Sequence, residues 1–550
     1  MRGSVARVTH EWEFAEHADD AEATFGALAD RVVDGLLARD PVTATWLGDH
    51  RFDDRLADLS EEGVRESLSV LDQALSAVDQ VDDLALGTTS AVDLEILRSR
   101  LTGERVVLQD IAPHTWDPLE ANPGTAIHLL LSRDYAPLED RLASVAARLA
   151  AVPEALEDAR RSLGEMPRVH VETAIGQFEG TRAMLVGTLE EELDRAPSAR
   201  RAVEPARSAA LGAIDAHVGW LRDRLESGVA NADPRLGPER YAAKLWATLD
   251  ADLTPDDVLH RAESDLARLE GEIARAAADY LGEPVPPPDD AGSLVRRALD
   301  LIADEARVTD ENVLALCESA FVTTTDFVRE LDIVTVHDVP VEIVEMPEIH
   351  RGVAVAYCDA PGPLETTSLP TFFAVSPTPA DWDAGRVASF YREYNARMLQ
   401  NLTVHEAMPG HYLEGVHSAK HPSTLRAVLR SGPFAEGWAV YTEDTMADAG
   451  YLDSDPLFRL VQLKFYLRAV ANSILDQGRT GYTYGALATP IAFLLFAFFL
   501  GLAIMLGAEL NNAIQEEWPA AATHADRVRG WLVYRRNGGT DPAGGEVSPS

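Results

Sequence analysis

The stretch HEAMPGHYLEG, residues 405 to 415, carries the residue types that hold and use a metal ion. His405 and His411 each offer a ring nitrogen as a ligand, and Glu406 follows the first of them directly. Zinc hydrolysis needs two or three such ligands, an open position for water, and a base beside that water. The stretch therefore predicts a metal site in which Glu406 is the general base.

The spacing of the two histidines is unusual for such a site. Zinc-binding helices place two histidines four residues apart, on one face. His405 and His411 are six residues apart, which on a regular helix turns the second imidazole by roughly 240° from the first. The ring of Pro409 collides with the carbonyl of His405, and Gly410 permits backbone conformations that other residues resist. We expect a kink or bulge that absorbs two residues and returns His411 to the face of His405.

A third ligand is expected from a separate helix. Glu436 lies 25 positions after His411, and Glu443 follows one heptad later on the same predicted helical face. This distance resembles the arrangement in gluzincin peptidases, in which a distant glutamate completes a His-His-Glu site. Glu436 is therefore the predicted ligand, and Glu443 is predicted to orient a histidine. His417 and His421 follow the turn closely and are predicted to be surface residues.

The donor set also limits the identity of the metal. Two histidines and a glutamate with an open position suit zinc, and manganese, cobalt or iron accept the same donors. The predicted cofactor is zinc.

A simpler interpretation is that the two histidines cap a helix end around the Pro-Gly pair and form local hydrogen bonds.

The elements that must position these residues are mostly helices. From residue 10 to about 330, apolar residues recur every three or four positions, and the breaks near 122, 231 and 282 coincide with Pro and Gly clusters. Between about 333 and 376, β-branched residues indicate a small sheet. Helix returns over 382–408, and two further helices are predicted around 434–450 and 456–478. We expect a mainly α fold with a small sheet near the site.

Composition narrows the class of protein. A chain of 550 residues can bury a large core and form more than one domain. Its net charge of −42 argues against nucleic acid as a partner, because phosphates would be repelled. Two cysteines exclude a disulfide-rich framework. The N-terminal sequence MRGSVARVTHEWEF lacks the apolar core of a signal peptide, so we expect a cytoplasmic domain.

Three stretches carry a resemblance to a known family. HEAMPGHYLEG, FAEGWAVYTE and LRAVANSILDQG resemble the bacterial domain-of-unknown-function family 885, a group of candidate metal-dependent peptidases, and the resemblance covers about 20–478. It implies a helical, zincin-like domain over 1–480 in which the metal site spans 405–443. It also implies metal ligation by His405, His411 and Glu436 and general-base catalysis by Glu406.

The same resemblance implies where a substrate would lie. Strands formed by GVAVAYCDAPG and PTFFAVSP would border the cleft, and an extended peptide could add to them as a further strand. Tyr357 and Tyr441 would then be contacts to the substrate carbonyl or to the transition state, although packed aromatics are the simpler interpretation. The implied partner is a peptide or a small amide.

The resemblance stops after Gly478. No charged residue occurs from Thr480 to Ala508, and an apolar stretch over 481–510 is long enough to cross the roughly 30 Å of a bilayer core. The segment over about 482–530 resembles the last membrane span of the BrkB/YihY family, which implies a C-terminal transmembrane helix that anchors a cytoplasmic body. The alternative is an apolar helix packed within a soluble cytoplasmic protein. Residues 511–550 are predicted to be a polar, partly disordered tail.

Three functions remain open on this basis. The leading hypothesis is a zinc-dependent hydrolase of peptide or related amide bonds. The alternative is a membrane-attached, catalytically impaired fusion or remnant that binds metal without turnover, because the closing helices of the peptidase family are missing after Gly478. A helical binding protein without a metal would require the pattern over 405–436 to be coincidental.

Overall fold

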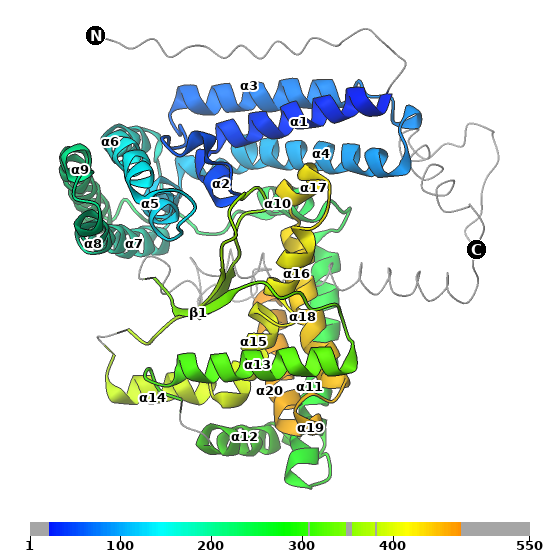
Figure 1. Ribbon diagram of the computed structural model, residues 1–550. Coiled ribbons are helices and arrows are strands. Elements are labelled where there is room, and N and C mark those ends of the chain that lie inside the picture. Colours follow the sequence, from blue (N-terminus) through cyan, green and yellow to red (C-terminus); the bar gives the residue numbers. More distant parts are fainter. Residues whose placement is uncertain (1–20, 306–307, 348–354, 380–381, 475–550) are drawn as a thin grey trace, which may run out of the picture.

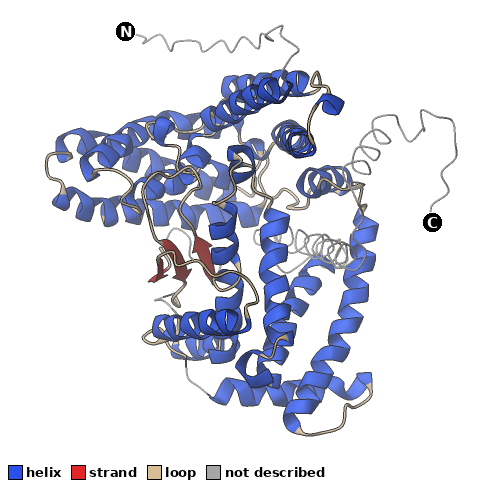
Figure 2. Ribbon diagram, turned by 45° about the vertical axis from the view of Figure 1, so that its right-hand side comes forward, coloured by secondary structure: helices blue, strands red, loops and turns tan. Residues whose placement is uncertain are grey.

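The computed structural model describes residues 21–305, 308–347, 355–379 and 382–474 (Figure 1). These residues form a mainly helical protein with one three-stranded sheet, as the sequence predicts. The N-terminal helices form an upper layer, and the helices of the C-terminal half stand below it with the sheet between the two groups (Figures 1 and 2).

The upper layer begins with three long helices that share one apolar core. Ser60 caps the second of them by accepting a hydrogen bond from the backbone N–H of Gly63 at 3.1 Å. Leucines at every third or fourth position fill the core between them. The layer consists of α1 (Ala21–Arg39), the short α2 (Pro41–Trp46), α3 (Glu61–Val78) and α4 (Thr88–Val106).

A bundle of helices continues the upper layer on one side. Its core contains the fully buried Leu149, Phe178 and Ile214. The bundle consists of α5 (Gly124–Leu131), α6 (Leu138–Ser162), α7 (Arg168–Val186), α8 (Thr188–Arg195) and α9 (Arg200–Glu226). The next helix, α10 (Pro238–Leu249), packs against α4 (Figure 1).

The lower group surrounds one buried helix, α15 (Ala396–Glu406), which ends at the motif. Every residue from 401 to 410 is buried. The other helices of this group are α11 (Pro255–Leu281), α12 (Pro288–Glu305), α13 (Val313–Leu331), α14 (Ala384–Glu393), α16 (His411–Ser418), α18 (Gly432–Asp448), α19 (Tyr451–Ser454) and α20 (Pro456–Ile474). The short α17 (Thr424–Val428) lies against α1 of the upper layer.

The sheet lies within the predicted range. Its strands are β1 (Val341–Glu345), β2 (Ala356–Asp359) and β3 (Thr371–Val375), in the order β1-β3-β2. β1 runs parallel to β3, and β2 runs antiparallel to it. Phe373 of β3 packs in the same core as Leu402 of α15, so the sheet is fixed against the helix that carries the motif.

One predicted helix is divided in the structure. The prediction of a single helix over 382–408 is wrong, because the chain breaks between α14 and α15. The side chain of Asn395 accepts hydrogen bonds from the backbone N–H groups of Arg397 and Met398, both at 3.1 Å. By accepting from these backbone N–H groups, which have no partner within the helix, Asn395 caps the start of α15 as a separate helix.

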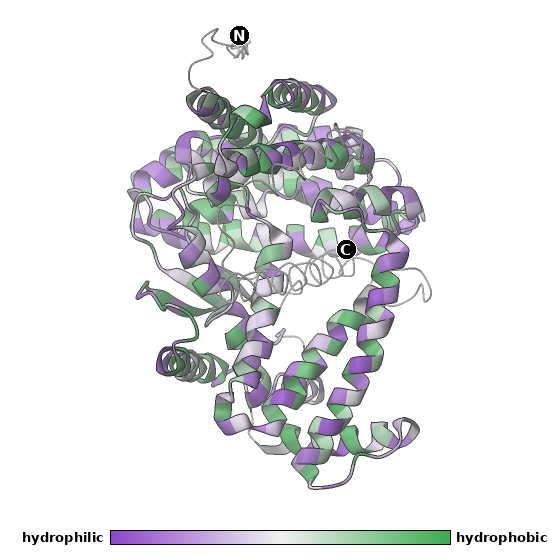
Figure 3. Ribbon diagram, turned by 90° about the vertical axis from the view of Figure 1, so that its right-hand side faces the viewer, coloured by the Kyte–Doolittle hydropathy of each residue, from purple (hydrophilic) through white to green (hydrophobic). Residues whose placement is uncertain are grey.

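The predicted transmembrane segment over 481–510 and the tail over 511–550 lie outside the described residues. Hydrophilic and apolar residues are interspersed along the drawn helices (Figure 3). None of the helices in the described part of the chain combines the length and the apolar character that a membrane span needs.

Candidate metal centre

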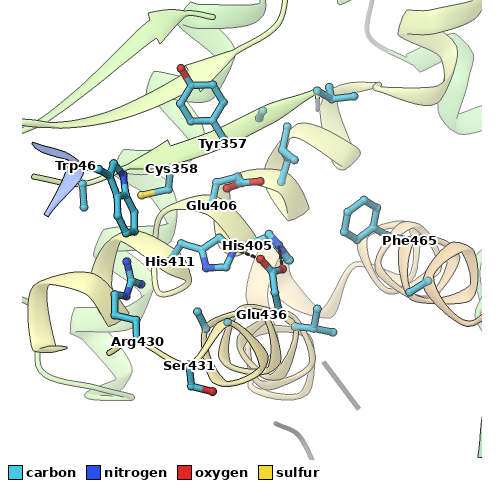
Figure 4. Close-up of a pocket in the computed structure, with 18 of the residues that line it drawn as sticks. Trp46, Tyr357, Cys358, His405, Glu406, His411, Arg430, Ser431, Glu436 and Phe465 are labelled. Atoms are coloured by element: carbon cyan, nitrogen blue, oxygen red, sulfur yellow. Dashed lines mark ion pairs between the residues drawn. The ribbon is translucent and has the colours of Figure 1, made fainter. Parts of the chain in front are cut away.

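The three predicted ligands come together from three different helices. His405 ends α15, His411 begins α16, and Glu436 lies on α18. One ligand atom from each lies within 4.8 Å of the others. The Oε2 and Oε1 atoms of Glu436 are 3.7 Å from His405 Nε2 and 3.6 Å from His411 Nε2, respectively (Figure 4).

This spacing suits a metal ion better than direct hydrogen bonds. Ligands on a tetrahedral zinc lie roughly 3.4 Å apart, because each bond is about 2.0–2.2 Å long. Both distances from Glu436 to the histidines exceed ordinary hydrogen-bond lengths and lie near that value. Two imidazoles and a carboxylate also match the donor set of hydrolytic zinc sites. The residues therefore fit a zinc ion.

A break between two helices, and not a bulge within one helix, brings the two histidines together despite their six-residue spacing. α15 ends at Glu406, a four-residue turn with a cis Met408–Pro409 bond follows, and α16 starts at His411. The backbone N–H of Gly410 donates to the carbonyl of Val404 at 2.9 Å. The prediction of a kink or bulge in a continuous helix is therefore wrong, because His411 reaches His405 from a second helix. The two imidazole planes meet at 88°, and their centroids are 4.9 Å apart.

Gly410 makes this close return possible. A Cβ atom at this position would lie 1.9 Å from the carbonyl oxygen of His405 and 2.4 Å from that of Val404. Both oxygens belong to the backbone of α15, so they have little freedom to move away. The turn therefore requires glycine because of space.

Glu443 fixes the orientation of the first histidine. Its Oε1 atom is 2.7 Å from His405 Nδ1, and its Oε2 atom accepts a hydrogen bond from Asn401 Nδ2 at 2.8 Å. Glu443 and Asn401 are both fully buried. A proton held on Nδ1 leaves the lone pair of Nε2 pointing to the ligand cluster, as in many histidines that bind metal.

Glu406 lies beside this cluster on the last turn of α15. Burial raises the pKa of its carboxyl to about 7; the charge of His405 opposes this shift and that of Glu436 adds to it. The backbone N–H of Cys358 in β2 donates a hydrogen bond to the same carboxylate. A carboxylate with a pKa near neutrality can take up a proton and release it again at physiological pH.

The electrostatic field of the cluster favours a cation. Burial lowers the pKa of His411 to about 4, so this imidazole is neutral and free to bind a metal. For His405, burial acts to lower the pKa, but the carboxylates of Glu436 and Glu443 outweigh it and raise the pKa well above its usual value. The surplus of negative charge around His405 is what a divalent cation would neutralise.

A cavity of about 700 Å³ opens beside the cluster. Its wall includes Tyr357 and Cys358 of β2 and, from the distant α2, Trp46 (Figure 4). Tyr441 is not part of the wall; its ring lies on α18 with its centroid 6.1 Å from that of Trp438. Of the two predicted tyrosines, Tyr357 is therefore the one placed to meet a ligand.

The remaining histidines of the motif region lie away from the cluster. His417 Nε2 is 2.9 Å from the carbonyl oxygen of Thr335, and His421 is exposed and accepts a hydrogen bond from the backbone of Ser423. Neither belongs to the group of converging ligand atoms in the described chain.

The sequence analysis missed several residues that shape the site. Asn401 stands four residues before His405, on the same helical face, and this spacing was a usable signal. Trp438 Nε1 donates to the carbonyl of Pro409 at 2.8 Å and holds the turn against α18. Arg430 and Trp46 line the cavity, and no local pattern in the sequence points to either.

Comparison with protein families identifies the chain. Residues 41–481, well over half of its length, match the family described as "Bacterial protein of unknown function (DUF885)". The chain belongs to this family. Residues 461–530 match a second family, described as "Virulence factor BrkB", so the two matches overlap at the end of the DUF885 region. No curated protein is similar enough to count as a match.

Two solved structures resemble this DUF885 protein over most of their length. A candidate lipoprotein of unknown function from Shewanella oneidensis is 25% identical with a TM-score of 0.71, covering 89% of this chain and 94% of that one. A candidate lipoprotein from Colwellia psychrerythraea is 15% identical with a TM-score of 0.70, covering 90% and 93%, respectively. The second likeness shows the fold alone.

Proposed function

We propose that this DUF885 protein is a zinc-dependent hydrolase of peptide or related amide bonds with a zincin-like active site. The observation that carries the proposal is the convergence of His405, His411 and Glu436, with the fully buried Glu443 behind His405. Zinc at this position would polarise a carbonyl group and make a bound water more acidic.

The residues around the cluster have separate roles in this proposal. Glu406 takes a proton from the attacking water and passes it to the leaving amine, for which its buried position beside the cluster is suited. Glu443 keeps His405 in one orientation. Because the N–H of Cys358 points to Glu406, the outer edge of β2 faces the centre, where an extended peptide could pair with the strand and Tyr357 could contact it.

A second candidate function follows from the second family match. The DUF885 match ends at residue 481 and the BrkB match runs from 461 to 530. A fusion chain that lacks part of the family's domain could bind metal without turnover. Attachment of such a chain to a membrane would depend on residues outside the described part.

The decisive experiment compares the wild type with Glu406→Gln. We expect both proteins to hold about one zinc per chain by elemental analysis, because Glu406 is not a ligand. Cleavage of a peptide mixture, followed by mass spectrometry, should fall by about 10²- to 10⁴-fold in the variant, the usual contribution of a general base.

Glu342→Gln is the matched control, since it makes the same change on the exposed face of β1. This control should retain the activity of the wild type. Equal cleavage by the wild type and Glu406→Gln would refute the assignment, and so would purified protein that binds no metal. A zinc-loaded wild type without any cleavage would favour the second candidate.

A further inference from the structure

The charges on the cavity wall are opposite to those of the whole chain. The chain carries a net charge of −42. Within the described residues, the only acidic side chains that line the cavity are Glu406 and Glu436, which belong to the centre. The charged side chains elsewhere on the wall are three arginines: Arg100, Arg430 and Arg468. Arg100 is paired with Glu104 at 2.7 Å, so Arg430 and Arg468 are the arginines whose charge favours an anionic group on the part of the wall outside the centre.

Of the three arginines, Arg430 is the one that a buried carboxylate holds in a fixed position beside the cavity. It stands between α17 and α18, and its Nη2 atom donates to Glu414 Oε2 at 2.7 Å. Glu414 is buried, and Ser418 Oγ donates to its other oxygen. This support holds the guanidinium in place, and it is the one hydrogen bond of the five N–H donors within the described residues. The Arg430 side chain is 31% exposed and lines the cavity.

Arg430 lies in the same cavity as the candidate metal centre. The three converging residues His405, His411 and Glu436 line this cavity as well. Figure 4 shows the guanidinium on the His411 side of the cavity, pointing toward Trp46. A ligand that contacts the cluster can therefore also reach Arg430.

The neighbouring backbone adds to the positive field. Ser431 caps α18, and Gly432 is the first residue of that helix; both line the cavity next to Arg430. The N-terminal end of a helix carries a partial positive charge. The guanidinium and the helix end thus face the same part of the cavity.

We propose that the cavity accepts substrates with a free carboxylate near the bond to be cleaved, and that Arg430 binds this carboxylate. A guanidinium can hold both carboxylate oxygens at once, which fixes the position of the substrate as well as its charge. The carboxylate could be the C-terminus of a short peptide or the side chain of an acidic residue. The cleavage part of this inference rests on the proposed function, whereas the binding part does not.

The test measures binding with turnover blocked. Full-length Glu406→Gln loaded with zinc is titrated by calorimetry with one short peptide in three forms: the free acid, the C-terminal amide, and the amide with one residue replaced by glutamate. We expect at least one form with a carboxylate to bind about 10- to 100-fold more tightly than the neutral amide. The form that gains affinity identifies the source of the carboxylate.

Substitution of the arginine must remove this preference. Arg430→Gln alone would leave the buried Glu414 without its partner, so the double variant Arg430→Gln/Glu414→Gln keeps a neutral pair able to hydrogen-bond. In this background the three forms should bind with equal affinity, while Arg65→Gln, an exposed arginine of α3, should leave the preference unchanged.

Two results would overturn the proposal: three forms that bind equally or not at all before the substitution, or a carboxylate preference that survives in the double variant. The proposed hydrolase function is judged separately, because these titrations do not involve cleavage. A wild type without activity would refute that function and leave the binding preference standing.

Discussion

At the scale of single residues, the candidate centre has beside it a buried carboxylate, Glu443, that is not one of the three converging ligands. Glu443 is fully buried, and burial raises the pKa of its carboxyl, while hydrogen bonds from His405 and Asn401 act to keep it charged. A buried carboxylate is costly unless it is paired, so its presence indicates a role in orienting His405.

Replacing Glu443 by glutamine should weaken metal binding without removing a ligand. The amide oxygen can still accept a hydrogen bond from His405 Nδ1. The negative charge that makes the imidazole a stronger ligand for the metal is lost. We expect zinc affinity to fall by about 10- to 100-fold, measured by competition with a chelating dye. Glu342→Gln is the control, and an unchanged affinity in Glu443→Gln would contradict the role assigned to Glu443.

At the scale of elements, the break between α15 and α16 sets the geometry of the ligands. Pro409 was correctly predicted to disturb the helix at this point, but the prediction of a bulge was wrong, because the chain leaves the helix altogether and starts another one. The local collision of a proline ring is readable from sequence. The choice between a bulge and a new helix depends on contacts such as that of Trp438 with Pro409.

Gly410→Ala tests this turn. The added Cβ would overlap the carbonyl oxygen of His405, so the turn must shift and His411 must move with it. We expect a loss of about 2 kcal/mol or more in the free energy of unfolding and a clear drop in zinc affinity. Urea denaturation and dye competition measure the two effects.

Gly415→Ala provides the comparison within α16, because among the described residues its Cβ would meet Ala360 alone, at an ordinary distance of 3.7 Å. This control should fold and bind zinc as the wild type does, and it should gain slightly in helix propensity. If Gly410→Ala behaves like Gly415→Ala, the turn does not constrain the site.

At the scale of the whole molecule, a charged histidine joins the upper layer to the chain that leads into β3. His50 Nδ1 lies 2.9 Å from Asp53 Oδ2, and His50 Nε2 lies 3.1 Å from Glu365 Oε1. The imidazole stacks on the ring of Tyr135, with the centroids 3.7 Å apart. Nearby, the backbone N–H of Leu364 donates to the carbonyl of Leu47, which lines the cavity. These contacts hold in place the part of the cavity wall that contains Leu47.

The contribution of His50 to stability should depend on pH. Burial acts to lower the pKa of His50, but Asp53 and Glu365 raise it to about 9. Because the pKa is higher in the folded state, the charged imidazole stabilises the fold fully below pH of about 6.5, and this contribution is lost as the pH rises to about 9. His50→Gln should therefore destabilise the protein more at pH 6 than at pH 9.5, by about 1–3 kcal/mol.

Urea denaturation of the wild type and His50→Gln at both pH values measures this difference. Comparing the two proteins at each pH cancels the titration of groups that they share. A gap between them that is the same at pH 6 and pH 9.5 would show that His50 is not charged in the folded protein.

The sequence by itself determined the mainly helical class, the position of the sheet, and the three residues that converge at the candidate centre. These features are local: helical periodicity, β-branched runs, a proline beside a glycine, and a heptad between Glu436 and Glu443 are all visible along the chain. The predicted helix around 434–450 corresponds to α18 for this reason.

Only the tertiary structure decided how the centre is enclosed. Trp46 and Arg430 reach one cavity from positions nearly 400 residues apart, and the backbone N–H of Cys358 reaches Glu406 from another element. Periodicity and spacing record which face of an element is buried, but they do not record which distant element will cover it. That choice depends on packing between surfaces of similar apolar composition, and it is settled only when the whole chain folds.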